Sequence, residues 1–195
     1  VALVTGYNNS DPVSSNNSST IIDTIYGASE SGNKWLYTYP TAGVPSTTGT
    51  LSRTVPTSNN TQSAIRRNQT MNMPLTPVLA GNLAINGNIL VRLCMKPRTT
   101  GNQDQRRVDV RLYRNTTQIG TTATQYFSNH NWQLYIFSIP HTGTTTVNSA
   151  DALRLEIQNV GTGSVDTHDV ELSTNGVNNV CVGDGTSRVE VNTTT

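Results

Sequence analysis

The sequence contains few charged residues: they make up 13% of its 195 residues and include only two lysines and four glutamates. Helical cytosolic proteins are rich in Glu, Lys, Ala and Leu, because these residues favour helices. The composition therefore excludes a mainly helical protein. Thirteen basic residues nearly balance twelve acidic ones, and a net charge of +1 argues against a nucleic-acid partner, which normally requires a strong basic excess.

Long apolar segments are missing as well. No run approaches the roughly 20 apolar residues of a membrane-spanning helix, so we expect no membrane span. The chain begins at Val1 rather than Met, and we expect either a removed leader peptide or numbering that starts inside a longer precursor. A removed leader predicts an extracellular protein, at the cell surface.

Cysteine is scarce, with Cys94 and Cys181 as its only two occurrences. Each lies among strand-forming residues, and neither has the CxxC spacing or the nearby histidine of a metal site. We predict a disulfide bond between them. Two buried free thiols are the alternative, and the mass measured with and without reductant separates the two.

Threonine, asparagine and serine are abundant and together supply 70 of the 195 residues. Polar residues alternate with apolar residues along several segments, as they do around Val108, Val110 and Leu112. This period of two is typical of half-buried strands. Turn residues separate such segments every eight to fifteen positions. The pattern predicts an all-β fold, specifically an antiparallel β-sandwich of the jelly-roll type. We expect strands near residues 34–39, 49–55, 83–95, 108–112, 118–123, 133–139, 153–157, 170–172 and 188–191.

The N-terminal region differs from the rest of the chain. Residues 1–20 read as an extended arm, a short apolar strand followed by a polar linker, and residues 21–195 as one sandwich domain with its framework at 75–193. A detached strand can complete a neighbour's sheet through main-chain hydrogen bonds. Pairing within its own domain is the alternative. The candidate strand-exchange residues are Val1, Ala2, Leu3, Val4 and Thr5.

Residues with catalytic or metal-binding potential are sparse. We predict no enzymatic activity, no catalytic residue and no cofactor, because no nucleophile motif or metal-ligand spacing occurs. Asp151, Asp166 and Asp184 are weak candidates for calcium ligands, since they lie in polar turns whose oxygens suit a hard cation. Ordinary turn formation is the alternative for all three.

Aromatic residues provide the candidate ligand site. Trp35 and Tyr37 are two positions apart on an expected strand and therefore share a face, and Trp132 precedes another strand. Exposed aromatic rings offer sugars an apolar, polarisable surface. Trp35, Tyr37 and Trp132 thus form a candidate glycan platform, with core packing as the alternative.

Three segments, residues 108–120, 132–140 and 150–157, carry a hairpin and a Leu-Arg-Leu-Glu-Ile strand. In this pattern the chain resembles secreted bacterial β-sandwich proteins of cell surfaces and pilus-type filaments. The resemblance implies a non-enzymatic extracellular structural protein, a subunit or decoration of a cell-surface filament or pilus. Its partners would be further copies of itself or other filament subunits. The alternatives are a carbohydrate-binding module or adhesin with glycan partners, and a viral jelly-roll coat subunit.

Overall fold

The computed structural model describes residues 32–43, 46–57, 62–98, 107–127, 129–160, 169–174, 180–181 and 186–193. Within these ranges the chain forms strands and connecting loops, with no helix and hence no helix able to cross a membrane. The strands are β1 (Gly32–Pro40), β2 (Gly49–Ser52), β3 (Gln62–Ile65), β4 (Thr70–Pro74), β5 (Leu83–Pro97), β6 (Arg107–Arg114), β7 (Thr117–Tyr126), β8 (Gln133–Ile139), β9 (Thr144–Val147), β10 (Leu153–Asn159), β11 (Val170–Ser173) and β12 (Arg188–Thr193).

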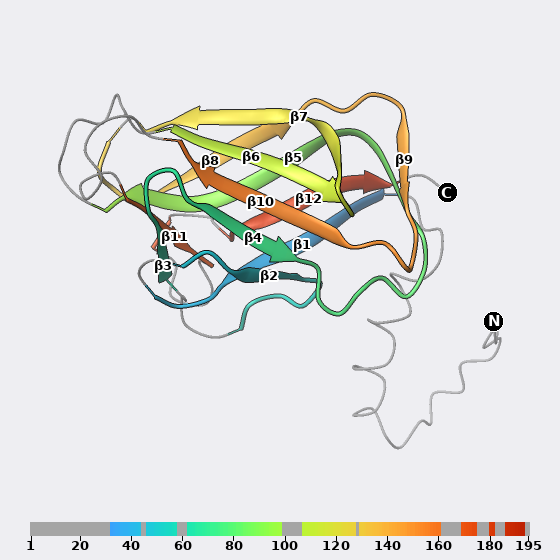
Figure 1. Ribbon diagram of the computed structural model, residues 1–195, viewed down its shortest axis with the longest axis horizontal. Coiled ribbons are helices and arrows are strands. Elements are labelled where there is room, and N and C mark those ends of the chain that lie inside the picture. The colour runs from blue at the N-terminus through green and yellow to red at the C-terminus, as the bar shows by residue number, and fades with distance from the viewer. Residues whose placement is uncertain are drawn as a thin grey trace, which may run out of the picture.

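Eight of these strands form a jelly roll. In chain order, the first of the eight pairs with the last, the second with the seventh, the third with the sixth and the fourth with the fifth: β1 with β12, β4 with β10, β5 with β8, and β6 with β7. All four pairs are antiparallel. This nested pairing gives one sheet ordered β1-β12-β5-β8 and a second ordered β4-β10-β6-β7, which lie as two layers (Figure 1). The predicted all-β, jelly-roll sandwich is confirmed.

Four further strands extend the larger sheet. β2 lies outside β1, while β9 and β11 pair with the two ends of β5, and β3 lies outside β11. β9 is thus at one end of the sandwich, and β3 and β11 are at the other (Figure 1). β5 is long enough, at 15 residues, to pair with β9 and then β8 along one edge and with β12 and then β11 along the other.

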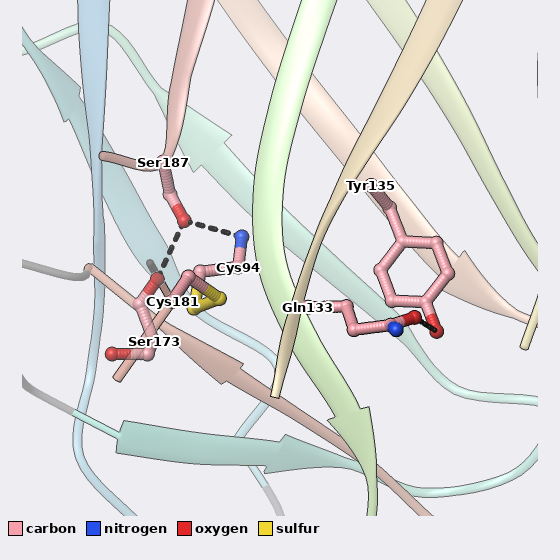
Figure 2. The surroundings of a disulfide bond; sticks show 6 residues. All are labelled: Cys94, Gln133, Tyr135, Ser173, Cys181 and Ser187. Carbon is pink, nitrogen blue, oxygen red and sulfur yellow. Dashed lines mark hydrogen bonds between the residues drawn. A yellow bond between two sulfur atoms is a disulfide. The ribbon is translucent and has the colours of Figure 1, made fainter. Parts of the chain in front are cut away.

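The change of partner from β12 to β11 is bridged by one side chain. Arg188 lies opposite Arg92, but two residues further along β5 the residue opposite Cys94 is Ser173. The buried Ser187 hydroxyl fills the gap, because it accepts a hydrogen bond from the Cys94 N–H at 2.8 Å and donates one to the Ser173 carbonyl at 2.6 Å (Figure 2). A serine side chain here replaces a rung of the backbone ladder.

The predicted disulfide is confirmed beside this junction. Cys94 and Cys181 are bonded, are almost fully buried and close a loop with a sequence separation of 87 residues (Figure 2). No free cysteine remains, since both are used. The bond ties the centre of the larger sheet to the segment that follows β11.

The core lies between the two sheets. Alternate residues of each strand point inward, and the inward set is apolar, so that burying each large aliphatic or aromatic side chain contributes roughly 1.5–3 kcal/mol. Tyr135 and Phe137 of β8 are both buried there. Fully buried members from both layers include Met71, Met73, Val91, Leu93, Val110, Leu112, Phe137, Leu155, Ile157 and Val189.

The first half of the chain contributes more framework than expected. β1 and β4 are the first two strands of the jelly roll, so the framework includes strands before residue 75. The strand expected near residues 49–55 is β2, whereas β3 and β4, and β9 later in the chain, were not predicted. Short strands with few inward apolar side chains give little alternation to detect: Met71 and Met73 anchor β4, whereas Ile65 is the one large apolar residue of β3. The predicted arm at residues 1–20, with Val1–Thr5, lies outside the described residues.

Candidate functional site

The outer face of the larger sheet carries a patch of aromatic and charged side chains. Because Leu36, Val91 and Val189 face the core, their strand neighbours point outward. The register places Trp35 opposite Glu190, while Tyr37, Arg188, Arg92 and Ile136 follow one another across β1, β12, β5 and β8. We call Trp35, Arg188, Glu190, Arg92 and Ile136 the Trp35–Arg92 patch.

Trp35 is held in place by two neighbours and still faces solvent. Its ring meets the Tyr37 ring edge-on, with 6.5 Å between centroids, and the Arg188 guanidinium lies over the indole, 4.3 Å from its centroid. Trp35 nevertheless remains 40% exposed, whereas Tyr37 is buried. A rigid indole with an accessible surface suits stacking against a planar or ring-shaped ligand.

One carboxylate links the two arginines of the patch. The Nε atoms of Arg92 and Arg188 each donate to the same Oε1 atom of Glu190 at 2.7 Å. Like charges placed directly opposite on neighbouring strands repel, so Glu190 permits Arg92 and Arg188 to lie side by side. Hydrogen bonds between ionised groups are about twice as strong as neutral ones, and this cluster rigidifies the surface around Trp35.

Trp132 lies elsewhere on the same face. The Lys96 ammonium is 5.1 Å from the centroid of its ring, and Lys96 in turn bonds to Glu171 at 3.0 Å. Across the sheet, Trp35 is in line with Leu90 of β5, and Lys96 is six residues further along β5 than Leu90. Six residues of a strand span about 20 Å, so Trp132 and Trp35 are separated by roughly that distance. The structure thus brings Trp35 and Tyr37 together and places Trp132 apart from them.

A shallow hollow lies near Trp132. Its volume is about 220 Å³, and it is lined by Gln62, Ser63, Ala64 and Glu171, at the edge where β3 pairs with β11. The small Ala64 side chain lies opposite Glu171 and leaves room between its larger neighbours. Ion pairs from Glu171 to Lys96 and Arg98 already engage the carboxylate.

The outer face of the smaller sheet is also charged, but its groups are paired with one another. Arg111 contacts Glu156 at 3.0 Å and Asp109 at 3.3 Å, and the Arg154 guanidinium covers the Tyr113 ring at 4.5 Å from its centroid. Such a network stabilises the surface of the sheet and leaves the Tyr113 ring covered.

Asp151, the one calcium candidate that can be placed, serves as a turn residue. Its carboxylate accepts hydrogen bonds from the Asn148 backbone N–H at 2.9 Å and from the side chain of Asn115 at 2.7 Å. Together with the charge of Arg114, these bonds lower the pKa of Asp151 below its ordinary value. The other two candidates, Asp166 and Asp184, lie outside the described residues. In the described ranges, no group of three or more His, Cys, Asp or Glu side chains gathers.

The patch also includes residues that the sequence pattern does not predict as part of a site. Each of them, Arg92, Arg188 and Glu190, occupies an outward position, which the alternation of its strand predicts. Their meeting depends on β12 lying between β1 and β5, which no local pattern reveals. Next to the patch, burial raises the pKa of Tyr39, whose hydroxyl donates to the Thr54 carbonyl, and the nearby Tyr37 adds to the effect.

Comparison with known proteins adds information about the fold. No family model matches the sequence, and no curated protein matches it either. The structure is similar to an aminopeptidase from the marine sediment archaeon Thaumarchaeota archaeon (TM-score 0.52, 8% identity, 84% of this chain and 37% of that one) and to a CocE/NonD family hydrolase from Staphylococcus aureus (0.49, 10%, 84% and 37%). A protein of infectious bursal disease virus, Gt strain, is more distant (0.29, 10%, 70% and 34%). The chain spans little more than a third of the length of these proteins, and at such identities the aminopeptidase likeness concerns the fold alone.

Proposed function

We propose that the chain is a non-enzymatic, extracellular carbohydrate-binding module that binds glycans on the outer face of the larger sheet. The observation that carries the proposal is Trp35, an indole that is 40% exposed yet fixed by Tyr37 and Arg188. Large aromatic side chains at a surface contribute much contact area at little entropic cost, and pre-organisation strengthens binding.

Other features agree with this proposal. The Cys94–Cys181 disulfide is of a kind that persists in oxidising, extracellular compartments. The jelly roll is a fold of lectins and of viral coat proteins, so the choice between functions rests on the surface rather than on the fold. The Trp35–Arg92 patch combines the hydrogen-bond donors of its two arginines, the Glu190 carboxylate as an acceptor and the Trp35 ring.

A glycan array followed by titration tests the proposal. We expect the wild-type protein to bind at least one glycan, and Trp35→Ala to weaken that binding about tenfold or more, which corresponds to about 1.4 kcal/mol. Tyr126→Ala is the matched control, because Tyr126 is an exposed aromatic residue on the other sheet. Trp132→Ala tests whether the distant tryptophan contributes, and we expect it to retain binding.

The outcome depends on all variants being folded, which the unfolding temperature establishes independently. If no glycan binds the wild-type protein, the proposal is wrong. Equal affinities of the wild-type protein and the Trp35→Ala variant would place the binding surface elsewhere and would contradict it too.

The filament or pilus subunit remains a prediction from the sequence. Its strand-exchange segment, Val1 to Thr5, lies outside the described residues. A variant lacking residues 1–7 tests it: loss of filaments in electron micrographs is the expected result, and normal assembly would contradict strand exchange.

A further inference from the structure

The two arginines of the Trp35–Arg92 patch are not equivalent. The Arg188 side chain is 3% exposed; its Nε bonds to Glu190, its Nη1 donates to the Thr186 carbonyl and its guanidinium covers Trp35. Arg188 is thus a structural part of the surface. The Arg92 side chain is 26% exposed and reaches the same carboxylate through Nε.

The remaining donors of Arg92 are available to a ligand. Within the described part of the chain, Glu190 is the partner of Arg92, and the bond uses Nε rather than the terminal nitrogens. A guanidinium presents its donors as a planar fork that matches the two oxygens of a carboxylate. The Arg92 guanidinium is therefore held through its Nε atom, and its terminal nitrogens are open to a ligand.

An apolar side chain flanks the open end of the Arg92 guanidinium. The Ile136 side chain is 42% exposed and lies opposite Arg92, and it lowers the local polarity in which an ion pair between Arg92 and a ligand carboxylate would form.

Trp35 lies close to this open fork. Both Nε atoms are 2.7 Å from one oxygen, so Arg92 and Arg188 are adjacent, and Arg188 in turn touches the indole. The Arg188 guanidinium thus lies between the Trp35 indole and the open terminal nitrogens of Arg92. A ligand that carries both a ring and a carboxylate can occupy the two at once.

We propose that the ligand of this patch is an acidic saccharide, whose carboxylate binds the terminal nitrogens of Arg92 while a sugar ring packs against Trp35. The inference rests on the proposed glycan-binding function and specifies its ligand class. The carboxylate can belong to a uronic acid or to a sialic acid, which share this chemistry.

Matched pairs of glycans test the inference and separate the two sources. An oligogalacturonate is compared with its methyl ester, and sialyllactose is compared with lactose, by calorimetric titration. For at least one pair, we expect the free acid to bind about tenfold or more tightly than its uncharged partner at low salt. The difference should shrink as ionic strength rises, because salt screens exposed charges.

Variants of the chain assign the effect to Arg92. Arg92→Gln should abolish the preference for the acid, while Arg92→Lys should keep part of it, since the charge stays and the fork is lost. Arg66→Gln, which removes the same charge from an exposed position, should leave the preference unchanged.

Each outcome has a distinct meaning. Binding of neutral glycans without any preference for an acid would overturn the inference and leave the proposed function standing. A preference that survives in Arg92→Gln would also overturn it. Failure of every glycan to bind would reject both the inference and the proposed function.

Discussion

Replacing Ser187 by alanine removes one oxygen atom from the junction between β11 and β12, and the structure predicts a large loss of stability. The Ser187 hydroxyl is fully buried, accepts from the Cys94 N–H at 2.8 Å and donates to the Ser173 carbonyl at 2.6 Å. In Ser187→Ala the buried Cys94 N–H loses this acceptor, and Ser173 loses this donor. A buried polar group left without its partner costs about 1–3 kcal/mol, so the two together predict a loss of about 2–6 kcal/mol.

Urea unfolding followed by tryptophan fluorescence measures this loss. The midpoint should fall at an unchanged m-value, because the surface exposed on unfolding stays the same, and the melting temperature should drop by about 4–24 °C. Ser138→Ala makes the same change at an exposed position of β8 and should alter stability by less than about 0.5 kcal/mol. A loss below about 1 kcal/mol in Ser187→Ala would refute the bridging role.

Three further predictions concern stability. Reducing the Cys94–Cys181 bond, whose sequence separation is 87 residues, should lower the free energy of unfolding by about 4–5 kcal/mol on the chain-entropy account, as measured with and without reductant in urea; an unchanged midpoint would contradict it. The pKa of Asp151 is lower in the folded than in the unfolded state, so its stabilisation is present at neutral pH and is lost as pH falls below about 5. The stability difference between the wild-type protein and Asp151→Asn should therefore shrink on acidification, and a constant difference would argue against this role. Gly120→Ala should destabilise by at least about 1–2 kcal/mol, because φ is +70° and the added Cβ would lie 2.5 Å from the Pro140 carbonyl oxygen; equal melting temperatures would refute this.

The fold was predictable where the chain alternates strictly. Val108, Val110 and Leu112 face the core while the residues between them point to the outer face of the sheet, because a two-layer sandwich packs one face of each sheet inward, and this imposes the period of two. β3 lacks such a signal, since Ala64 is buried although it lies on the outward side of its strand, opposite Glu171. Burial by neighbouring segments leaves no trace in local periodicity.

The site was predictable only in part. Trp35 and Tyr37 share a face because they are two residues apart on one strand, and their contact agrees with that expectation. Trp132 was assigned to the same platform from its residue type. The sequence contains no information on distances across a sheet, so it did not reveal that Trp132 lies apart. Arg92 and Glu190, 98 positions apart, meet through the pairing of β5 with β12, and such long-range pairing depends on the whole topology.

The most direct test of glycan binding at this face is an NMR titration of isotope-labelled protein with a glycan that the array identifies. The account predicts that the indole N–H signal of Trp35 and the Nε–H signal of Arg92 shift in proportion to occupancy, while the indole signal of Trp132 stays in place. Shifts confined to Trp132 or to the smaller sheet, with Trp35 unchanged, would contradict it.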